Sequence, residues 1–178
     1  MVIAITGTPG TGKTSVASLL RARGYDIIEI DQIVRSAGLI SGYDEERGSA
    51  EIDIDGLSEA VRSAISNKGT ILVGHLAHLI DPSLLELIII LRCKPSILEK
   101  RLRNLGWKEE KILENVEAEA CDVILIESLE QSDSVFEIDT STKTPDEVAT
   151  CVLEILAGER EKYAYGNIDW SEEVLNWF

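Results

Sequence analysis

The residues best suited to chemistry lie near the start of the chain, where eight consecutive residues read G-T-P-G-T-G-K-T. Gly7, Gly10 and Gly12 let the backbone turn so that successive N–H groups point inward toward phosphate oxygens. Lys13 then reaches the β- and γ-phosphates as a point charge, and the Thr14 hydroxyl is placed to bind Mg²⁺. This spacing predicts a loop that holds the phosphates of a nucleotide.

The sequence around this loop supports the same interpretation. An apolar run at residues 2–5 predicts a buried strand before the loop, and Val16, Leu19 and Leu20 recur at helical spacing after it. The phosphates would therefore lie at a helix N-terminus, where main-chain N–H groups attract anions. A glycine-rich turn that matches by chance would lack these flanking elements. The residues expected to bind the nucleotide here are Gly10, Thr11, Gly12, Lys13, Thr14 and Ser15.

Length and composition narrow the class of protein. The chain has 178 residues, enough for one domain with a substantial core, and no stretch approaches the roughly 18 consecutive apolar residues of a membrane span. Met1 leads directly into a predicted strand, so we expect no signal peptide, no membrane association and a cytoplasmic location. Cys93, Cys121 and Cys151 lack metal-ligand spacing, which indicates reduced thiols in the core.

The charge balance limits the partners. The formal net charge is −15 at pH 7. Nucleic-acid binding depends mainly on cations that contact phosphates, so direct binding of RNA or DNA is not expected. A basic partner protein suits an acidic surface, and solubility or adaptation to a salty cytoplasm explains the charge equally well.

Two residues after the first helix are candidates for the chemistry. Asp31 follows a predicted strand at 25–30, at the edge where ligands of parallel sheets collect, and could orient water on Mg²⁺ or the acceptor. Its alternative role is to cap a helix at 32–37. Arg35 on that helix could hold an anionic acceptor, or could face solvent. The aperiodic stretch 38–55 is then a loop that closes over the acceptor, or a solvated excursion.

A predicted strand at 70–73 ends in Val73-Gly74-His75, where enzymes with this kind of loop commonly offer an acidic residue to the metal shell. That carboxylate is missing here. His75 lies at the functional end of the strand and could position a water or contact the γ-phosphate, whereas a buried, hydrogen-bonded histidine is the alternative. His78 has no such position and is expected to be structural.

The next strand is predicted at 84–91, and a basic segment follows it. A helix is expected to begin near Pro95, since proline is tolerated in a first helical turn. Arg101 and Arg103 on this helix are placed to serve as a short lid that neutralises the charge on a migrating phosphoryl group. Ordinary pairing along the helix, such as Glu99 with Arg103, is the alternative.

The rest of the chain supplies further helices, one strand and a tail. A long acidic helix is expected at 109–129 and the last strand at 134–138. In nucleotide-binding sheets the loop after such a strand, here 139–145, often lies against the base. The acidic tail at 159–178 contains two tryptophans and is expected to dock on the body of the protein, with binding of a partner as the alternative.

Five predicted strands that alternate with helices indicate an α/β fold in three layers, with a parallel sheet and right-handed crossovers. Chain length and short linkers favour a small nucleotide kinase over a motor ATPase. We therefore predict a P-loop NTPase fold of the nucleoside monophosphate kinase type, with a five-stranded parallel sheet. A single domain would span 1–178, with an acceptor-binding insertion at about 31–54, a short lid at about 101–112 and the tail at 159–178.

Several of these features occur together in one family. Residues 6–14 have its form of the phosphate loop, and Arg35 lies where its acceptor-site arginine lies. Residues 42–46 match its G-Y-D-E-E, and His75 matches the histidine of its acidic-x-His motif. The segment 90–107 is similar to the one that leads into its short lid. The sequence thus resembles the archaeal and nuclear branch of the adenylate kinases, which includes the coilin-interacting nuclear ATPase and its yeast ribosome-maturation relative.

Two positions depart from the pattern of that family. The acidic member of acidic-x-His is Val73 here. The metal shell would therefore lack one carboxylate, and ATP hydrolysis would lose its support. The lid arginine directly before the glycine is Leu105, so Arg101 or Arg103 would have to supply its charge. If both losses are uncompensated, phosphoryl transfer is expected to be slow.

The resemblance implies reversible transfer of the γ-phosphoryl group from ATP with Mg²⁺ to a nucleoside monophosphate, above all AMP, with ATPase activity in addition. The acceptor is already an anion, so alignment and screening of two negative groups are the main task. The resemblance assigns Lys13 to the donor phosphates, Thr14 to Mg²⁺ and Arg35 to the acceptor. Arg101 would contact the transferring group and His75 would assist, with Asp31 as a second metal residue.

Two other functions stay open. Members of this family act in the maturation of small-subunit rRNA, so the chain could be an ATP-dependent assembly factor that holds a basic small-subunit ribosomal protein, with little kinase turnover. A kinase for a small metabolite such as shikimate or dephospho-coenzyme A would need an acceptor pocket richer in arginine than residues 38–55 supply.

Overall fold

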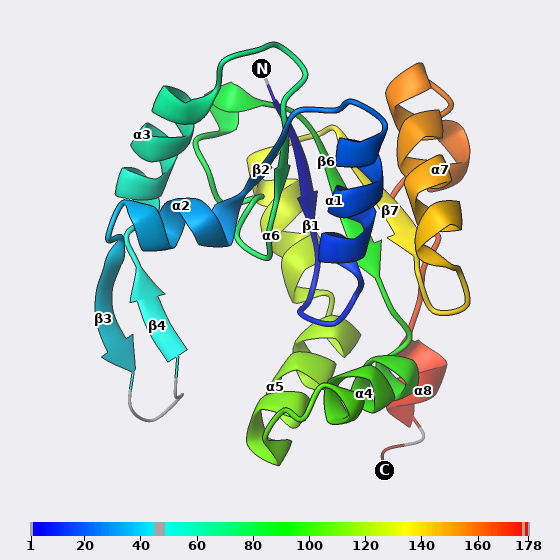
Figure 1. Cartoon of the computed structure of the whole chain (residues 1–178). Coiled ribbons are helices and arrows are strands. Elements are labelled where there is room, and N and C mark those ends of the chain that lie inside the picture. Colours follow the sequence, from blue (N-terminus) through cyan, green and yellow to red (C-terminus); the bar gives the residue numbers. More distant parts are fainter. Residues whose placement is uncertain (1, 45–48, 176, 178) are drawn as a thin grey trace.

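A computed structural model describes residues 2–44, 49–175 and 177, and a five-stranded sheet forms its centre (Figure 1). The strand order is β2-β5-β1-β6-β7, and every pairing in this sheet is parallel. The predicted five-stranded parallel sheet is confirmed. The strands are β2 (Ile27–Glu29), β5 (Ile71–Val73), β1 (Val2–Thr6), β6 (Leu85–Arg92) and β7 (Val135–Asp139).

The two central strands are apolar on both faces because helices cover both sides of the sheet. Every residue of β1 is buried, and only Glu86 is exposed in β6. Register places Ile3 beside Ile71 on one side and beside Leu87 on the other. Strands of this kind end at one common edge, so the residues that follow them converge.

Helices α1 (Lys13–Ala22) and α7 (Pro145–Ala157) cover one face of the sheet. Val16 and Leu20 of α1 pack with Val148 and Val152 of α7 against β1, β5 and β6. Helix α7 begins with a full capping box, in which the Thr144 hydroxyl accepts from the N–H of Glu147 and the Glu147 carboxylate accepts from the N–H of Thr144. The start of α7 is therefore fixed beside the loop that follows β7.

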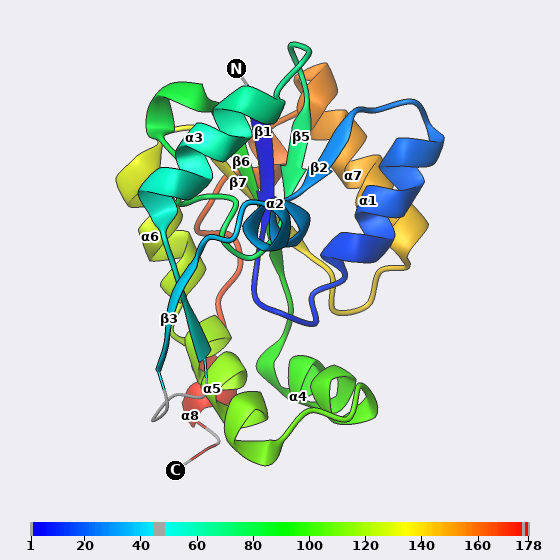
Figure 2. The same cartoon turned by 60° about the vertical axis from the view of Figure 1, so that its left-hand side comes forward.

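The opposite face is covered by α2 (Ile30–Ser36), α3 (Ile54–Ala64) and α6 (Val123–Gln131). Ile30, Leu57 and Leu125, one from each helix, belong to the cluster of buried residues that includes Leu72 and Ile88 of the sheet. Figure 2 shows this layer after a turn of 60°. The three layers agree with the predicted α/β P-loop architecture.

Helices α4 (Pro95–Asn104) and α5 (Glu109–Ala120) project beyond the carboxyl ends of the strands and form a small unit with its own apolar core (Figures 1 and 2). Leu98 and Leu102 of α4 pack there against Ile112 and Val116 of α5. The turn between the two helices carries Leu105 and Trp107, both exposed. This unit contains the predicted lid.

The stretch 38–55 is more ordered than a loop. It contains an antiparallel hairpin of β3 (Ile40–Asp44) and β4 (Ser49–Ile52), so the expectation of a loop here was wrong. Residues 45 and 46 of the G-Y-D-E-E motif lie outside the described residues. Helix α3 then begins at Ile54, because the Asp53 side chain accepts a hydrogen bond from the N–H of Gly56 and caps the helix.

The single acidic helix expected at 109–129 is two helices, α5 and α6. The chain breaks at Asp122, the one described non-glycine residue with positive φ, at 56°. Its carboxylate pairs with the buried guanidinium of Arg92, so a tertiary contact holds the break. Cys121, beside the break, is exposed and is no core thiol, which corrects the prediction; Cys93 is buried as predicted.

The tail folds back on the body, which confirms the docking prediction. Ala164 forms an isolated antiparallel bridge with Phe136 of β7, and the N–H of Gly166 donates to Glu137 at 2.8 Å. The tail contains the 3₁₀ turn η2 (Glu161–Tyr163) and ends in α8 (Ser171–Leu175), which lies against α4 and α5 (Figures 1 and 2). Among the described residues, no helix is long and apolar enough to cross a membrane.

Candidate active site

The loop between β1 and α1 depends on glycine at three positions. Gly7, Gly10 and Gly12 have φ values of 136°, 91° and 97°, a region that other residues rarely adopt. A Cβ at position 7 would also lie 2.3 Å from the carbonyl oxygen of Leu91 in β6. The loop can therefore pack against the end of the sheet only if residue 7 has no side chain.

The N-terminus of α1 is open to an anion. Gly12 is its N-cap without a side-chain cap, and its first turn contains no acidic residue. The first helical hydrogen bond runs from the N–H of Val16 to the carbonyl of Gly12, which leaves the preceding N–H groups without helical partners. Such N–H groups, together with the helix dipole, favour phosphate binding.

Lys13 is held against its own loop. Its Nζ donates to the carbonyl of Gly7 at 2.6 Å and to that of Thr8 at 2.9 Å. Burial lowers the pKa of Lys13 to about 8, against the opposing charges of Asp31 and Glu119. The ammonium group is therefore mostly charged at neutral pH and is fixed beside the N-terminus of α1.

A cavity of about 520 Å³ opens in front of this loop at the carboxyl edge of the sheet. We call it the main cavity. It brings together four predicted groups: the phosphate loop, Thr14, Asp31 and His75. Its lining residues are Pro9, Gly10, Gly12, Lys13, Thr14, Ser15, Glu29, Asp31, Val73, Gly74, His75, Leu105 and Trp107.

Asp31 and His75 lie close together in the lining of the main cavity. His75 Nδ1 lies 3.8 Å from Asp31 Oδ1, and both side chains are about half exposed. Burial lowers the pKa of His75, which Asp31 partly opposes, so the imidazole is neutral at pH 7. Asp31 lies in the first turn of α2, whose N-cap is Glu29, so the alternative role of Asp31 as the cap was wrong.

His78 has the structural role expected of it. It is 1% exposed, and its ring nitrogens lie 2.9 Å from Thr6 Oγ1 and 3.0 Å from Glu127 Oε2. Thr6 also donates to the carbonyl of His75 at 3.3 Å. Local spacing carries no signal for this chain of contacts, because Glu127 lies 49 residues away from His78.

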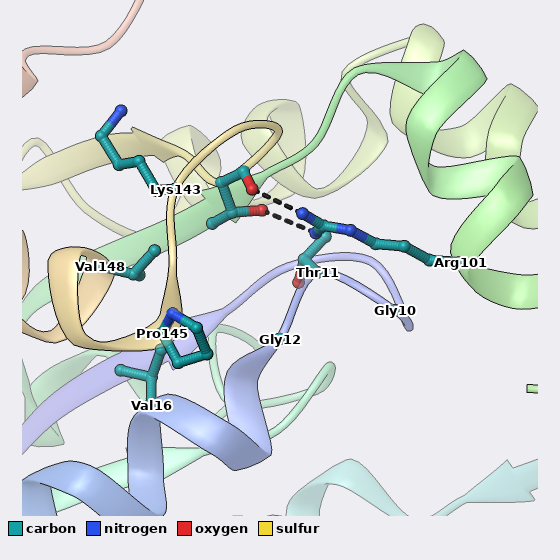
Figure 3. Close-up of a pocket in the computed structure, with 9 residues that line it drawn as sticks. Gly10, Thr11, Gly12, Val16, Arg101, Lys143, Pro145 and Val148 are labelled. Atoms are coloured by element: carbon teal, nitrogen blue, oxygen red, sulfur yellow. Dashed lines mark hydrogen bonds between the residues drawn. The ribbon is translucent and has the colours of Figure 1, made fainter.

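Arg101 borders a second cavity, of about 270 Å³, on the other side of the phosphate loop (Figure 3). We call it the side cavity. The guanidinium donates to the carbonyls of Thr140 at 2.6 Å and Ser141 at 3.3 Å, and to Thr140 Oγ1 at 3.2 Å. Arg101 thus joins α4 to the loop after β7. The side cavity is lined by Gly10, Thr11, Gly12, Val16, Arg101, Thr140, Lys143, Pro145 and Val148.

Two predicted arginines do not line either cavity. Arg103 is on the surface, where its guanidinium donates to Glu99 at 2.9 Å and to Glu109 at 2.6 Å. The alternative pairing of Glu99 with Arg103 is therefore the one that the structure contains. Arg35 lies exposed in the last turn of α2.

Comparison with known proteins places this geometry in a family. A family model described as an AAA domain matches residues 3–122. A curated protein of Archaeoglobus fulgidus named "Putative adenylate kinase" is 45% identical over 177 residues, covering 98% of this chain and 94% of its own. One of the same name from Thermococcus onnurineus is 40% identical, covering 97% and 93%. This chain belongs to the archaeal adenylate kinase family.

Solved structures support the fold. Shikimate kinase from Bacteroides thetaiotaomicron has a TM-score of 0.61 at 18% identity, covering 88% of this chain and 98% of its own. Shikimate kinase from Acinetobacter baumannii, in complex with shikimate, has a TM-score of 0.60 at 17% identity, covering 90% and 94%. The predicted kinase-type P-loop fold is confirmed, and the family relatives confirm a phosphotransferase.

This member of the archaeal adenylate kinase family has apolar residues at two places where charge was expected. Val73 lines the main cavity and is 5% exposed, and Leu105 lines it from the turn after α4. Trp107, which was not predicted as a site residue, also lines the main cavity and is 39% exposed. A single tryptophan after Gly106 does not by itself indicate a cavity, and only the fold shows that it lines one.

The oxygen atoms of the main cavity fit Mg²⁺ better than a tightly chelated metal. No cluster of three or more His, Cys, Asp or Glu residues suited to a metal occurs within residues 2–44 and 49–175. Mg²⁺ usually keeps several waters and binds through few protein ligands plus phosphate oxygens. Thr14 and Asp31, which both line the main cavity, carry oxygen atoms of the kind that Mg²⁺ prefers.

Proposed function

We propose that this protein is an adenylate kinase, which transfers the γ-phosphoryl group of ATP reversibly to AMP. The observation that carries the proposal is the main cavity, where a phosphate loop with Lys13 faces Asp31 and His75 at the carboxyl edge of the sheet. Two phosphate-bearing molecules can meet there. Similarity to the curated adenylate kinases over almost the whole chain supports the same reaction.

The donor would bind on the phosphate-loop side. The N–H groups at the start of α1 and the ammonium of Lys13 would hold the β- and γ-phosphates, as in other P-loop enzymes. The base would lie in the side cavity, next to Pro145 and Val148. Arg101 borders that cavity and would exchange a carbonyl partner for an oxygen of the transferring group.

Thr14 and Asp31 would hold Mg²⁺, through the Thr14 hydroxyl and waters oriented by Asp31. When bound, the ion screens the negative charge of the phosphates. His75, neutral and with Nδ1 3.8 Å from Asp31 Oδ1, would position a water beside that carboxylate or contact the γ-phosphate. Because Val73 replaces the acidic residue typical of the family, Asp31 is the main carboxylate that we assign to the metal.

The acceptor would bind between α2 and the β3–β4 hairpin, with Arg35 as the cation for its phosphate. Arg35 is exposed in the last turn of α2, which directly precedes the hairpin. An AMP phosphate is already an anion, so alignment rather than a strong base drives the transfer. The reaction uses ATP and AMP, and we place it in the cytoplasm.

A panel of acceptors tests this proposal. Purified protein is mixed with ATP, Mg²⁺ and one of AMP, CMP, UMP, GMP or shikimate, and ADP release is followed. We expect the fastest release with AMP and only a slow ATPase rate without an acceptor. A rate with AMP no higher than that of Lys13→Ala would refute the kinase. Faster release with shikimate would place the protein among metabolite kinases.

The excess of acidic residues supports a second candidate, an assembly factor that holds a basic small-subunit ribosomal protein during rRNA maturation. With 32 acidic and 17 basic residues, the chain attracts cationic proteins over long range. Immobilised protein should capture a purified basic ribosomal protein at low salt and release it with ATP. Capture that is absent at low salt would count against this role, independently of the kinase assay.

A further inference from the structure

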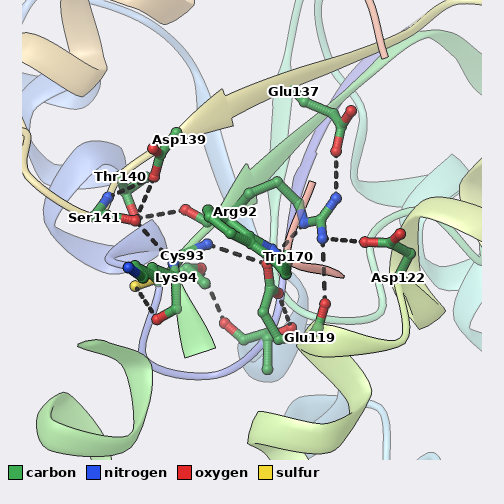
Figure 4. Close-up of polar contacts among 12 residues, drawn as sticks. Arg92, Cys93, Lys94, Glu119, Asp122, Glu137, Asp139, Thr140, Ser141 and Trp170 are labelled. Carbon is green, nitrogen blue, oxygen red and sulfur yellow. Dashed lines mark hydrogen bonds and ion pairs between the residues drawn. The ribbon is translucent and has the colours of Figure 1, made fainter. Parts of the chain in front are cut away.

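A buried polar cluster lies behind the phosphate loop, where β6 ends (Figure 4). Arg92 is 1% exposed, and its Nε donates to Glu119 Oε1 at 2.7 Å, while its other nitrogens reach Glu137 and Asp122. Glu119 and Glu137 are each 3% exposed. Charges buried so deeply are costly unless their hydrogen bonds are all made, so the geometry of this cluster is tightly constrained.

The Glu119 carboxylate accepts four hydrogen bonds. Its Oε1 accepts from Arg92 Nε, from the N–H of Cys93 at 3.1 Å and from Trp170 Nε1 at 3.3 Å. Its Oε2 accepts from Thr8 Oγ1 at 2.6 Å. The carboxylate thus joins the last turn of α5, the end of β6, the C-terminal tail and the phosphate loop.

Thr8 connects Glu119 to the phosphate-binding groups. Its carbonyl accepts from Lys13 Nζ at 2.9 Å and from the Thr11 hydroxyl at 2.9 Å. The N–H of Thr11 donates to the same carbonyl at 3.3 Å. One residue is therefore anchored through its side chain by Glu119 and supports Lys13 through its main chain.

We propose that Glu119 is a positioning residue, which fixes the phosphate loop in its nucleotide-binding shape through the hydroxyl of Thr8. Glu119 lines neither cavity and touches no group that we assign to the nucleotide. It acts on ATP binding through the loop and through its charge, which together with that of Asp31 raises the pKa of Lys13. This inference concerns the binding of ATP phosphates and does not depend on which acceptor the enzyme uses.

A variant that keeps the carboxylate separates positioning from charge. Removal of the charge of Glu119 would reduce the repulsion of phosphate but would also lower the pKa of Lys13, and these two effects on ATP binding oppose each other. Thr8→Val leaves that charge in place and removes only the hydroxyl that Glu119 holds. Weaker ATP binding by Thr8→Val therefore identifies positioning.

Glu119→Gln reverses the hydrogen bond to Thr8. The glutamine oxygen must face the guanidinium of Arg92, which has no acceptor atom, so the amide NH₂ takes the place of Oε2 and donates to the Thr8 hydroxyl, which can also accept. Thr8→Val removes the hydroxyl from the other end of the same contact with little change of shape. Glu117→Gln, on the exposed face of α5, is the matched control for the change of charge.

The experiment is calorimetric titration of each variant with ATP and Mg²⁺, with urea unfolding to show that each is folded. We expect Thr8→Val, which leaves Glu119 Oε2 without its hydroxyl donor, to weaken ATP binding about tenfold. Glu119→Gln should weaken it by less, because a neutral, reversed hydrogen bond replaces the charge-assisted one. The double variant should bind about as weakly as Thr8→Val, because both changes act on one contact. Glu117→Gln should bind as the parent does.

Binding by folded Thr8→Val that equals or exceeds that of the parent overturns the inference, and so do fully additive effects in the double variant. If Thr8→Val does not fold, Thr8→Ala, which also lacks the hydroxyl, takes its place in the same comparison. Failure of the proposed kinase is separate, because it appears as a parent protein that binds ATP yet forms no ADP from AMP, which leaves these comparisons intact.

Discussion

At the scale of single residues, Lys13 combines two properties that the phosphate loop needs. Its Nζ is fixed by the carbonyls of Gly7 and Thr8, and burial has removed part of its hydration. A preorganised charge that has little water to lose binds an anion more strongly than a free one. The same burial makes the charge sensitive to pH.

We expect ATP binding to weaken above pH 8. The pKa of Lys13 is lowered to about 8 in the free protein, and the phosphates of ATP would raise it in the complex. Binding then takes up a proton above pH 8, so affinity is full below that pH and falls up to about tenfold per unit above it. Calorimetry at pH 7, 8 and 9 measures this, and equal affinities would contradict it.

The two arginines of α4 should differ strongly. Arg101 reaches the loop after β7 beside the phosphate loop, whereas Arg103 pairs with Glu99 and Glu109 on the surface. We expect Arg101→Ala to lower kcat about 100-fold, as the loss of a cation on a transferring group does. Arg103→Ala should stay within about twofold of the parent, since exposed pairs contribute little. Equal losses in a steady-state assay would be inconsistent with this assignment.

At the scale of elements, the phosphate loop and its flanking strand and helix were predictable, because glycine spacing and apolar periodicity are local signals. The hairpin β3–β4 was not, since its strands have little apolar alternation and are paired outside the main sheet. The break between α5 and α6 depends on the contact of Asp122 with Arg92, which is 30 residues away in the chain. Contacts between residues so far apart in the chain produce no periodic pattern in the sequence.

The same distinction holds within the site. Thr14, Asp31 and His75 follow strands or the loop directly, so their convergence at the sheet edge could be predicted from order alone. The surface pairing of Arg103 and the place of Trp107 in the main cavity depend on how α4 and α5 pack together. Helical spacing alone does not fix that packing.

The docked tail should contribute measurably to stability. Trp170 donates its indole N–H to Glu119, and the guanidinium of Arg92 lies 5.9 Å from its ring. We expect Trp170→Phe, which keeps a ring over Arg92 but loses the donor, to lower the free energy of unfolding by about 1 kcal/mol. Trp177→Phe, at an exposed position, is the control. Equal urea midpoints for both variants would rule out this contribution.

At the scale of the whole molecule, acidic charge surrounds a core that the sheet and its helices bury. A net charge of −15 favours expansion through self-repulsion, and the anionic substrates are attracted only locally, by the loop and its lysine. The local cations and the open N-terminus of α1 must therefore outweigh an unfavourable long-range field.

Salt should accordingly stabilise the protein. Screening of the 15 uncompensated negative charges reduces self-repulsion in the compact state. We expect the urea midpoint of unfolding to rise between 0.05 M and 0.5 M NaCl, measured by circular dichroism. A midpoint that falls with salt would mean that favourable ion pairs on the surface, such as those of Arg103, outweigh the repulsion.

Transfer of a labelled phosphoryl group tests the adenylate kinase proposal most directly. ATP labelled at the γ-phosphate is mixed with the protein, Mg²⁺ and unlabelled AMP, and the products are separated. We expect the label to appear in ADP, to depend on AMP and to be lost in Lys13→Ala. Label found only in inorganic phosphate, at the same rate with and without AMP, would show an ATPase that does not use AMP and would contradict the proposal.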